Sequence, residues 1–181
     1  MAETKAHVTT VLSILQKEFP AYLETIIERA GKIGTALHKA LELINDNKKF
    51  KVENDDAIFQ NWLMEYQIIR GGFHKVESEI SLENNGYCGR IDSIADEVII
   101  DYKSGTRNKN VEKMWLYQLA AYYNLCVENK IKIKGGLILH FNKKNGKVTQ
   151  IEIPLKVLKY KGIIFNQLYI VYNDLQSDLR I

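Results

Sequence analysis

Apolar residues recur at helical spacing in the first part of the chain. Residues 21–46 carry them three and four positions apart, which predicts an amphipathic helix. Gly31 and Gly34 weaken that helix, so two shorter helices with a break between them are a second possibility. Further helices are predicted over residues 7–17 and over residues 55–70, the latter closed by a pair of glycines.

The remaining chain alternates segments of strand and helix character. Strands are predicted over residues 74–83, 87–95, 98–103, 134–142 and 147–154, and helices over 110–129 and 155–176. The last two strands flank Lys144-Asn145-Gly146, which is typical of a hairpin because Asn and Gly tolerate positive φ. We therefore expect the α/β class, with a central mixed sheet flanked by helices.

Length and composition indicate one domain. A chain of 181 residues, 46% of them hydrophobic and 26% charged, can bury one hydrophobic core. Since no repeat or Pro/Gly-rich linker divides it, we expect a single domain over residues 1–181. Its predicted parts are N-terminal helices in 7–71, the core sheet with the candidate chemistry in 74–123, and a hairpin and helix in 134–178.

Charge and cysteine content limit the classes of partner and cofactor. A formal net charge of +3 permits a nucleic-acid partner without arguing for one. Two cysteines, Cys88 and Cys126, can build neither a disulfide framework nor a four-thiolate cluster, so a reducing cytoplasm and no iron–sulfur cluster are expected. No apolar run reaches the roughly 20 residues that span a bilayer, and we expect no membrane association.

The segment GYCGRIDSIADEVIIDYKSG, residues 86–105, places two carboxylates at matching positions. If Asp96-Glu97 forms a two-residue turn, residues whose numbers sum to 193 face each other. Asp92 then lies opposite Asp101, on the same side of the sheet as Lys103. Alternation puts the mostly apolar set on the other side: Ile91, Ser93, Ala95, Val98, Ile100 and Tyr102.

Facing carboxylates repel one another, by roughly 0.2–1 kcal/mol in an exposed sheet. A hard divalent cation such as Mg²⁺, which prefers oxygen ligands, turns that repulsion into attraction. Asp92, Asp101 and the backbone carbonyl of Tyr102 are the candidate ligands, and Lys103 could orient a water or offset charge on a phosphate. The alternative is a solvated strand surface on which Asp101 and Lys103 form a simple ion pair.

These residues, with QLAAYY at 118–123, resemble the PD-(D/E)xK nuclease superfamily. The similarity is to the RecB-like exonuclease branch, which includes the CRISPR-associated RecB-like nucleases and the mitochondrial genome maintenance exonuclease. Its motifs match Gly89-Arg90-Ile91-Asp92, Asp101-Tyr102-Lys103-Ser104, and Gln118 with Tyr122. The resemblance, over residues 34–123, implies a restriction-endonuclease-like fold and a site with Asp92, Asp101 and Lys103 as catalytic residues.

The resemblance extends to two positions upstream. GTALHKALE, residues 34–42, is similar to the family's N-terminal helix with a metal-binding histidine, which would be His38. A lone histidine on an amphipathic helix is more often structural, and an imidazole ligand would suit Mn²⁺ somewhat better than Mg²⁺. Glu77 stands where the branch often has an acidic catalytic residue, and Glu79, on the same strand face, is the alternative.

Candidate substrate contacts follow the second motif. Gln118 and Tyr122 are four residues apart on one helix face, where Gln118 could bind a phosphate or a water and Tyr122 could stack on a base. The alternative is a surface glutamine and a core tyrosine. Basic and polar side chains precede them and suit a phosphate backbone, or else form a solvated loop: Ser104, Arg107, Lys109 and Lys113.

The expected function is that of a metal-dependent DNA exonuclease using Mg²⁺ or Mn²⁺. The resemblance implies action on single-stranded DNA or DNA ends, in recombination, repair or phage DNA metabolism, with partner proteins unspecified. The iron–sulfur cysteines of several relatives are missing, and no helicase motif accompanies the domain. A nuclease-like module that binds DNA without cutting is one alternative, and an endonuclease or RNA-acting enzyme is another.

Overall fold

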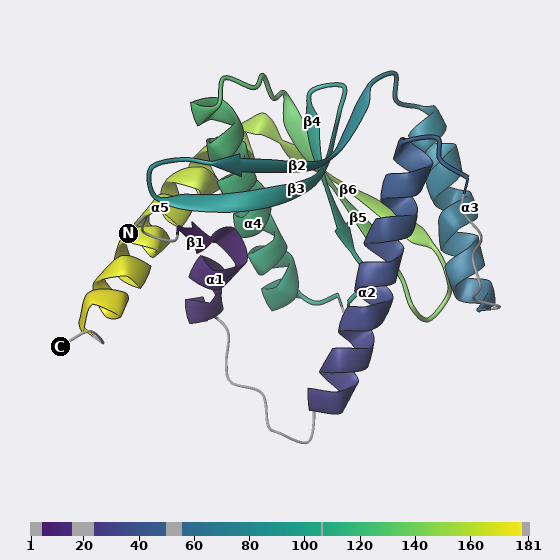
Figure 1. Cartoon of the computed structure of the whole chain (residues 1–181), viewed down its shortest axis with the longest axis horizontal. Coiled ribbons are helices and arrows are strands. Elements are labelled where there is room, and N and C mark those ends of the chain that lie inside the picture. The colour runs from purple at the N-terminus through teal and green to yellow at the C-terminus, as the bar shows by residue number, and fades with distance from the viewer. Residues whose placement is uncertain (1–4, 16–23, 50–55, 106, 179–181) are drawn as a thin grey trace.

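The computed structural model describes residues 5–15, 24–49, 56–105 and 107–178. Six strands form one mixed sheet with helices on both faces (Figure 1). The predicted α/β class, a central mixed sheet flanked by helices, is confirmed. Within the described part of the chain, no helix is both long and apolar enough to cross a membrane.

The sheet is organised around β3 (Tyr87–Ala95). β2 (Val76–Glu83) lies antiparallel along one edge of β3, and β4 (Val98–Lys103) is antiparallel to it on the other edge. β5 (Gly135–Phe141) runs parallel to β4, and β6 (Val148–Pro154) antiparallel to β5. The sequence did not predict the two-residue β1 (Ala6–His7), which lies parallel to β3.

Two groups of helices cover the two faces of the sheet (Figure 1). One face carries α2 (Glu24–Asn45) and α3 (Ala57–Gly71), and the other carries α1 (Val8–Leu12), α4 (Lys109–Glu128) and α5 (Leu155–Asp178). A short 3-10 helix, Ser13–Leu15, follows α1. α2 is continuous through both of its glycines, so the predicted possibility of a break is wrong. The predicted helical residues 16, 17, 21–23 and 55 lie outside the described part.

Each face has its own hydrophobic core. On the side of α2 and α3 the fully buried large side chains come from both helices and from β4 and β5: Leu37, Leu41, Trp62, Tyr66, Ile100, Leu139 and Phe141. On the side of α4 and α5 they are Ile91, Ile99, Leu119, Leu125 and Phe165. The sheet is therefore buried on both sides, which fixes the positions of polar residues that its strands carry inward.

Both hairpins form as predicted. The β3–β4 ladder pairs Ser93 with Ile100 and Ala95 with Val98, which is the predicted register. Its turn residues, Asp96 and Glu97, have φ values of 47° and 68°, an uncommon conformation for residues with a Cβ. The β5–β6 hairpin ends in a longer loop, 142–147, in which Gly146 has a positive φ of 69°.

Candidate active site

The candidate site lies where β4 leaves β3. The β3–β4 ladder ends at Ser93 and Ile100, one position before the two motif aspartates. β1 pairs with the same edge of β3 only at residues 87–88, so no strand among the described residues pairs with 89–92 on that edge. Instead, the Asp92 carboxylate accepts a hydrogen bond from the Tyr102 N–H at 2.7 Å. Asp92 thus takes the place of a strand partner at this opening.

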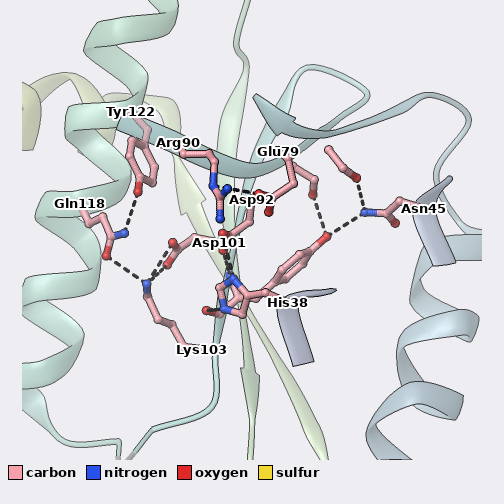
Figure 2. Close-up of polar contacts among 12 residues, drawn as sticks. His38, Asn45, Glu79, Arg90, Asp92, Asp101, Lys103, Gln118 and Tyr122 are labelled. Carbon is pink, nitrogen blue, oxygen red and sulfur yellow. Dashed lines mark hydrogen bonds and ion pairs between the residues drawn. The ribbon is translucent and has the colours of Figure 1, made fainter. Parts of the chain in front are cut away.

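His38 joins Asp92 to the backbone of β4. Its Nδ1 lies 3.1 Å from the Asp92 Oδ1, and its Nε2–H donates to the Tyr102 carbonyl at 3.0 Å (Figure 2). Burial lowers the pKa of the His38 imidazole, but the Asp92 carboxylate outweighs burial and the pKa is raised overall. The structure therefore brings together three of the four predicted ligand groups: the imidazole, the Asp92 carboxylate and the Tyr102 carbonyl.

Asp101 lies beside this group and is only 1% exposed. The Lys103 ammonium donates to its Oδ1 at 3.0 Å and lies 2.9 Å from its Oδ2 outside hydrogen-bonding geometry, so Oδ2 has no hydrogen-bond partner among the described residues. Burial raises the pKa of the Asp101 carboxyl, the Lys103 charge opposes this, and the Asp92 charge adds to it. Asp101 is a buried carboxylate with unused capacity to accept a cation.

Lys103 is held between Asp101 and α4. Its ammonium also donates to the Gln118 Oε1 at 3.0 Å, and the Gln118 Nε2 donates to the Tyr122 hydroxyl at 2.8 Å (Figure 2). Tyr122 is 2% exposed, so its ring offers no face to a base and the predicted stacking is corrected to a positioning contact with Gln118. A Cβ at Gly89 would lie 2.7 Å from this ring, which explains the glycine of the first motif.

The structure separates the two candidate glutamates. Glu77 pairs with Lys75 at 2.5 Å on an exposed surface and is not brought to the site. Glu79 has a left-handed φ of 56°, and its carboxylate pairs with Arg90 at 2.8 Å next to Asp92 (Figure 2). Burial raises the pKa of Glu79, Arg90 opposes the shift, and Asp92 adds to it. The alternative glutamate is therefore the one near the aspartates.

A buried polar network that the sequence reasoning missed lies beneath the site. The Tyr102 hydroxyl is 2.6 Å from the Tyr66 hydroxyl and 2.8 Å from the Ser93 Oγ, and it accepts from the Asn45 Nδ2 at 3.2 Å. Asn45 also donates to the Ser78 Oγ at 2.8 Å. A signal was present, because Asn45 lies seven residues after His38 and so on the same helix face. This network anchors the residue whose backbone contacts both His38 and Asp92.

The predicted phosphate contacts lie in the loop after β4 and in the first turns of α4. Ser104 directly follows Lys103, while Arg107 pairs with Glu112 at 2.5 Å. Lys109 is exposed at the start of α4. Lys113 is exposed and, with Lys103 and Gln118, lines a groove of about 720 Å³. The groove extends from the site along α1 and the first half of α4, and its lining includes the apolar side chains of Leu12, Met114 and Leu168.

The donor set suits a hard divalent cation. It comprises two carboxylates, a carbonyl and an imidazole, and the Oδ2 of Asp101, which contacts Lys103 without a hydrogen bond, is a buried acceptor. As placed, however, no three His, Cys, Asp or Glu side chains of the described residues converge at metal-ligand geometry. The chemistry of the residues thus fits a cation, while His38 and Asp92 are paired with each other.

Comparisons with known proteins bear on the fold. No family model matches the chain, and no curated protein matches it. The crystal structure of SSO0001 is similar over 95% of this chain and 77% of its own, with a TM-score of 0.52 at 15% identity. A phage related exonuclease from Haemophilus somnus 129PT aligns over 97% of this chain and 96% of its own, with a TM-score of 0.45 at 13% identity. The chain therefore shares its overall fold with SSO0001.

Proposed function

We propose that this chain is a metal-dependent deoxyribonuclease that acts on single-stranded DNA or DNA ends. One observation carries the proposal: Asp101, 1% exposed, is a carboxylate buried beside Lys103 and the Asp92–His38 pair, and its Oδ2 accepts no hydrogen bond from the described residues. Burying a carboxylate costs several kcal/mol, and the paired part of the same hairpin manages without one. A role in chemistry explains why the chain retains it.

The metal ligands in this proposal are Asp92, Asp101, the Tyr102 carbonyl and His38. Mg²⁺ or Mn²⁺ held by them would activate a water and neutralise charge on the scissile phosphate. Deprotonated His38 offers Nδ1 as a nitrogen ligand, because its Nε2–H is held by the Tyr102 carbonyl. The contact between His38 and Asp92 in the structure keeps the two groups close enough to share an ion.

Besides the metal, Lys103 supplies a positive charge at the candidate site. It is 17% exposed and fixed by Asp101 and Gln118, so its ammonium is oriented before any substrate arrives. A preorganised cation of this kind stabilises the negative charge that develops during phosphodiester hydrolysis. Glu79, which shares its electrostatic environment with Asp92, is the candidate for a further acidic group, and Arg90 is its counter-charge.

The groove lined by Lys103, Gln118 and Lys113 supports a nucleic-acid strand as substrate. The charged side chains in its lining suit phosphates, and the apolar ones suit unpaired bases. The preference for ends rests on the resemblance of the motifs to RecB-like exonucleases. Recombination, repair or phage DNA metabolism are the corresponding settings.

A labelled-DNA assay tests the proposal. Linear single strands labelled at either end, circular single strands, linear duplex and single-stranded RNA are incubated with the protein and Mn²⁺, Mg²⁺ or EDTA. We expect shortening of linear DNA with Mn²⁺ or Mg²⁺, none in EDTA, and none with Asp101→Asn. Glu77→Gln, whose carboxylate lies away from the site, serves as the matched control.

Each other outcome identifies a rival. Cutting of circular DNA would indicate an endonuclease, and preferential loss of RNA would indicate a ribonuclease. Tight DNA binding without cleavage under any metal would replace the nuclease with a binding module.

A further inference from the structure

The outer face of α5 is apolar and unpartnered within the described part of the chain. Among the described residues, nine large hydrophobic side chains are exposed, and five of them belong to α5: Tyr160, Ile163, Ile170, Val171 and Leu175. Their exposed fractions range from 48% to 64%. At 100° per residue they occupy an arc of about 140° on one side of the helix. Scattered exposed apolar residues are ordinary, but a continuous stripe of this kind indicates an interaction surface.

This stripe is separate from the face that α5 packs against its own domain. The inner face carries the fully buried Leu158 and Phe165, together with Tyr169, whose hydroxyl donates to the Gly86 carbonyl at 2.9 Å. Asn124 of α4 donates to the Gly162 carbonyl on this side. In Figure 1, α5 lies along the end of the molecule opposite α2 and α3, with its last turns beyond the sheet. The outer stripe is therefore accessible to another molecule.

The charges on α5 complement those of a second, antiparallel α5. Lys156 and Lys159 lie near its start and Asp174 near its end, all three exposed. Lys159 and Asp174 are equally far from the midpoint between Asn166 and Gln167, and the same midpoint relates Ile163 to Ile170. A two-fold axis there would place Lys159 against Asp174 and Ile163 against Ile170 of the other copy. A parallel arrangement would instead oppose like charges and like helix dipoles.

We propose that the protein forms a two-fold symmetric homodimer through antiparallel packing of α5 on α5. The isoleucines at 163 and 170 form the centre of the interface, and each Lys159 pairs with the other copy's Asp174 at its ends. Leu168, which lines the end of the groove, is next to the edge of the stripe on the helix, whereas Lys103 and Gln118 of the candidate site lie on β4 and α4. No residue of the proposed interface belongs to that site, so the dimer is proposed independently of the nuclease function.

Analytical ultracentrifugation over a wide concentration range tests the dimer. We expect a monomer–dimer equilibrium, with Ile163→Glu and Ile170→Glu each raising the dimer dissociation constant about tenfold or more. Ile68→Glu on α3 is the matched control, because Ile68 is 78% exposed on a different helix and its substitution should leave the equilibrium unchanged. Circular dichroism and nuclease activity of all variants should match wild type, since the substituted positions are exposed and remote from the site.

A charge swap tests the antiparallel arrangement. Lys159→Glu or Asp174→Lys alone should weaken the dimer severalfold by opposing like charges, and the double variant should restore it. A protein that is monomeric at every concentration overturns the proposal. A dimer whose dissociation constant is unchanged by the Ile163 and Ile170 substitutions also overturns it. A double variant that dimerises more weakly than either single variant overturns the antiparallel pairing.

Discussion

The β3–β4 hairpin has two halves that differ in what determines their residues. Near the turn the two strands pair with each other (the paired half), and beyond Ser93 and Ile100 they separate (the parted half). In the paired half, residues 93–95 and 98–100 form a ladder with apolar neighbours on both faces of the sheet. In the parted half, β3 and β4 no longer pair with each other, and the Asp92 and Asp101 side chains contact His38 and Lys103. The paired half is explained by stability alone, whereas the parted half holds charges that a stable hairpin does not need.

The comparison indicates that the parted half contains a charge whose burial lowers the stability of the folded protein. Asp101 is as buried as Ile99 and Ile100 before it on β4, yet its carboxyl pKa is raised because burial outweighs the attraction of Lys103. A side chain whose charged form is disfavoured by the fold is a candidate for function. Substitutions should therefore affect activity in the parted half and stability in the paired half.

The largest effect is expected from Asp101→Asn. It keeps the shape of the side chain but removes the charge, so cleavage with Mn²⁺ should fall by roughly a thousandfold or more. Thermal unfolding in EDTA should occur at the same temperature as wild type or higher, because the buried charge is removed. Added Mn²⁺ should raise the melting temperature of wild type but not of the variant. Retained activity together with lost stability would reverse the comparison of the two halves.

Lys103→Met should lower the rate of cleavage by roughly a hundredfold or more, because the oriented ammonium beside Asp101 is lost. Single-turnover rates at saturating DNA measure this effect apart from binding. Lys113→Met, at an exposed position in the same groove, is the control and should weaken DNA binding more than it slows cleavage. Equal effects of both variants on binding alone would make Lys103 a phosphate contact only.

The two glutamates of β2 offer a direct comparison. Glu79→Gln should lower cleavage by about tenfold, because its carboxylate lies in the electrostatic environment of Asp92, whereas Glu77→Gln should leave it unchanged. Initial rates with Mn²⁺ measure both. If Glu77→Gln has the larger effect, the strand position inferred from the motif is right and the geometry of the free protein is misleading.

The local sequence pattern predicted the register of this hairpin, but it did not predict that the two strands separate before Asp92 and Asp101. A two-residue turn at Asp96-Glu97 predicted that paired residues have numbers summing to 193, and the observed ladder confirms this register. The parting depends on β1 and β4 sharing one edge of β3, which is a tertiary arrangement that no local pattern encodes. The same holds for Glu77 and Glu79, which have the same parity in the strand, while only Glu79 lies next to Asp92 and has a left-handed φ.

The buried network shows a second limit of the sequence. Tyr102 belongs to a motif, and its position among apolar residues indicated a core side chain. Its partners Asn45 and Tyr66 come from α2 and α3, both far from β4 in the chain, so only the packed structure brings their polar groups together. The candidate ligands could be predicted because they stand in short sequence motifs. The residues that position them could not, because they lie outside those motifs.

Tyr102→Phe tests the link between the network and the site. Removing the hydroxyl leaves Tyr66, Ser93 and Asn45 short of a partner, which should lower the free energy of unfolding by about 1–3 kcal/mol. Cleavage should fall only severalfold, because the backbone groups of residue 102 remain. Urea unfolding measures the first and initial rates the second, with Tyr123→Phe, which lies outside the network, as control.

The smallest effects are expected at the turn of the paired half. Glu97 has a φ of 68°, which is unfavourable for a residue with a Cβ, and its contact with Lys132 is largely exposed. Glu97→Gly should therefore raise the free energy of unfolding by about 0.5–1 kcal/mol, after allowing for the greater freedom of glycine in the unfolded chain. Urea unfolding measures the change, and cleavage with Mn²⁺ should stay the same.

Asp96→Gly is the matched control for that turn and should have the opposite sign. Asp96 shares the left-handed conformation, but its carboxylate accepts the N–H groups of His74 and Lys75 at 3.0 Å each. These hydrogen bonds lower the pKa of the Asp96 carboxyl, so its stabilising contribution is complete at neutral pH and is lost as the pH falls through that lowered value. The variant should therefore be less stable than wild type at neutral pH, by a margin that shrinks on acidification. A change of cleavage rate in either turn variant would show that the paired half also positions the site, and the two halves would no longer be separable.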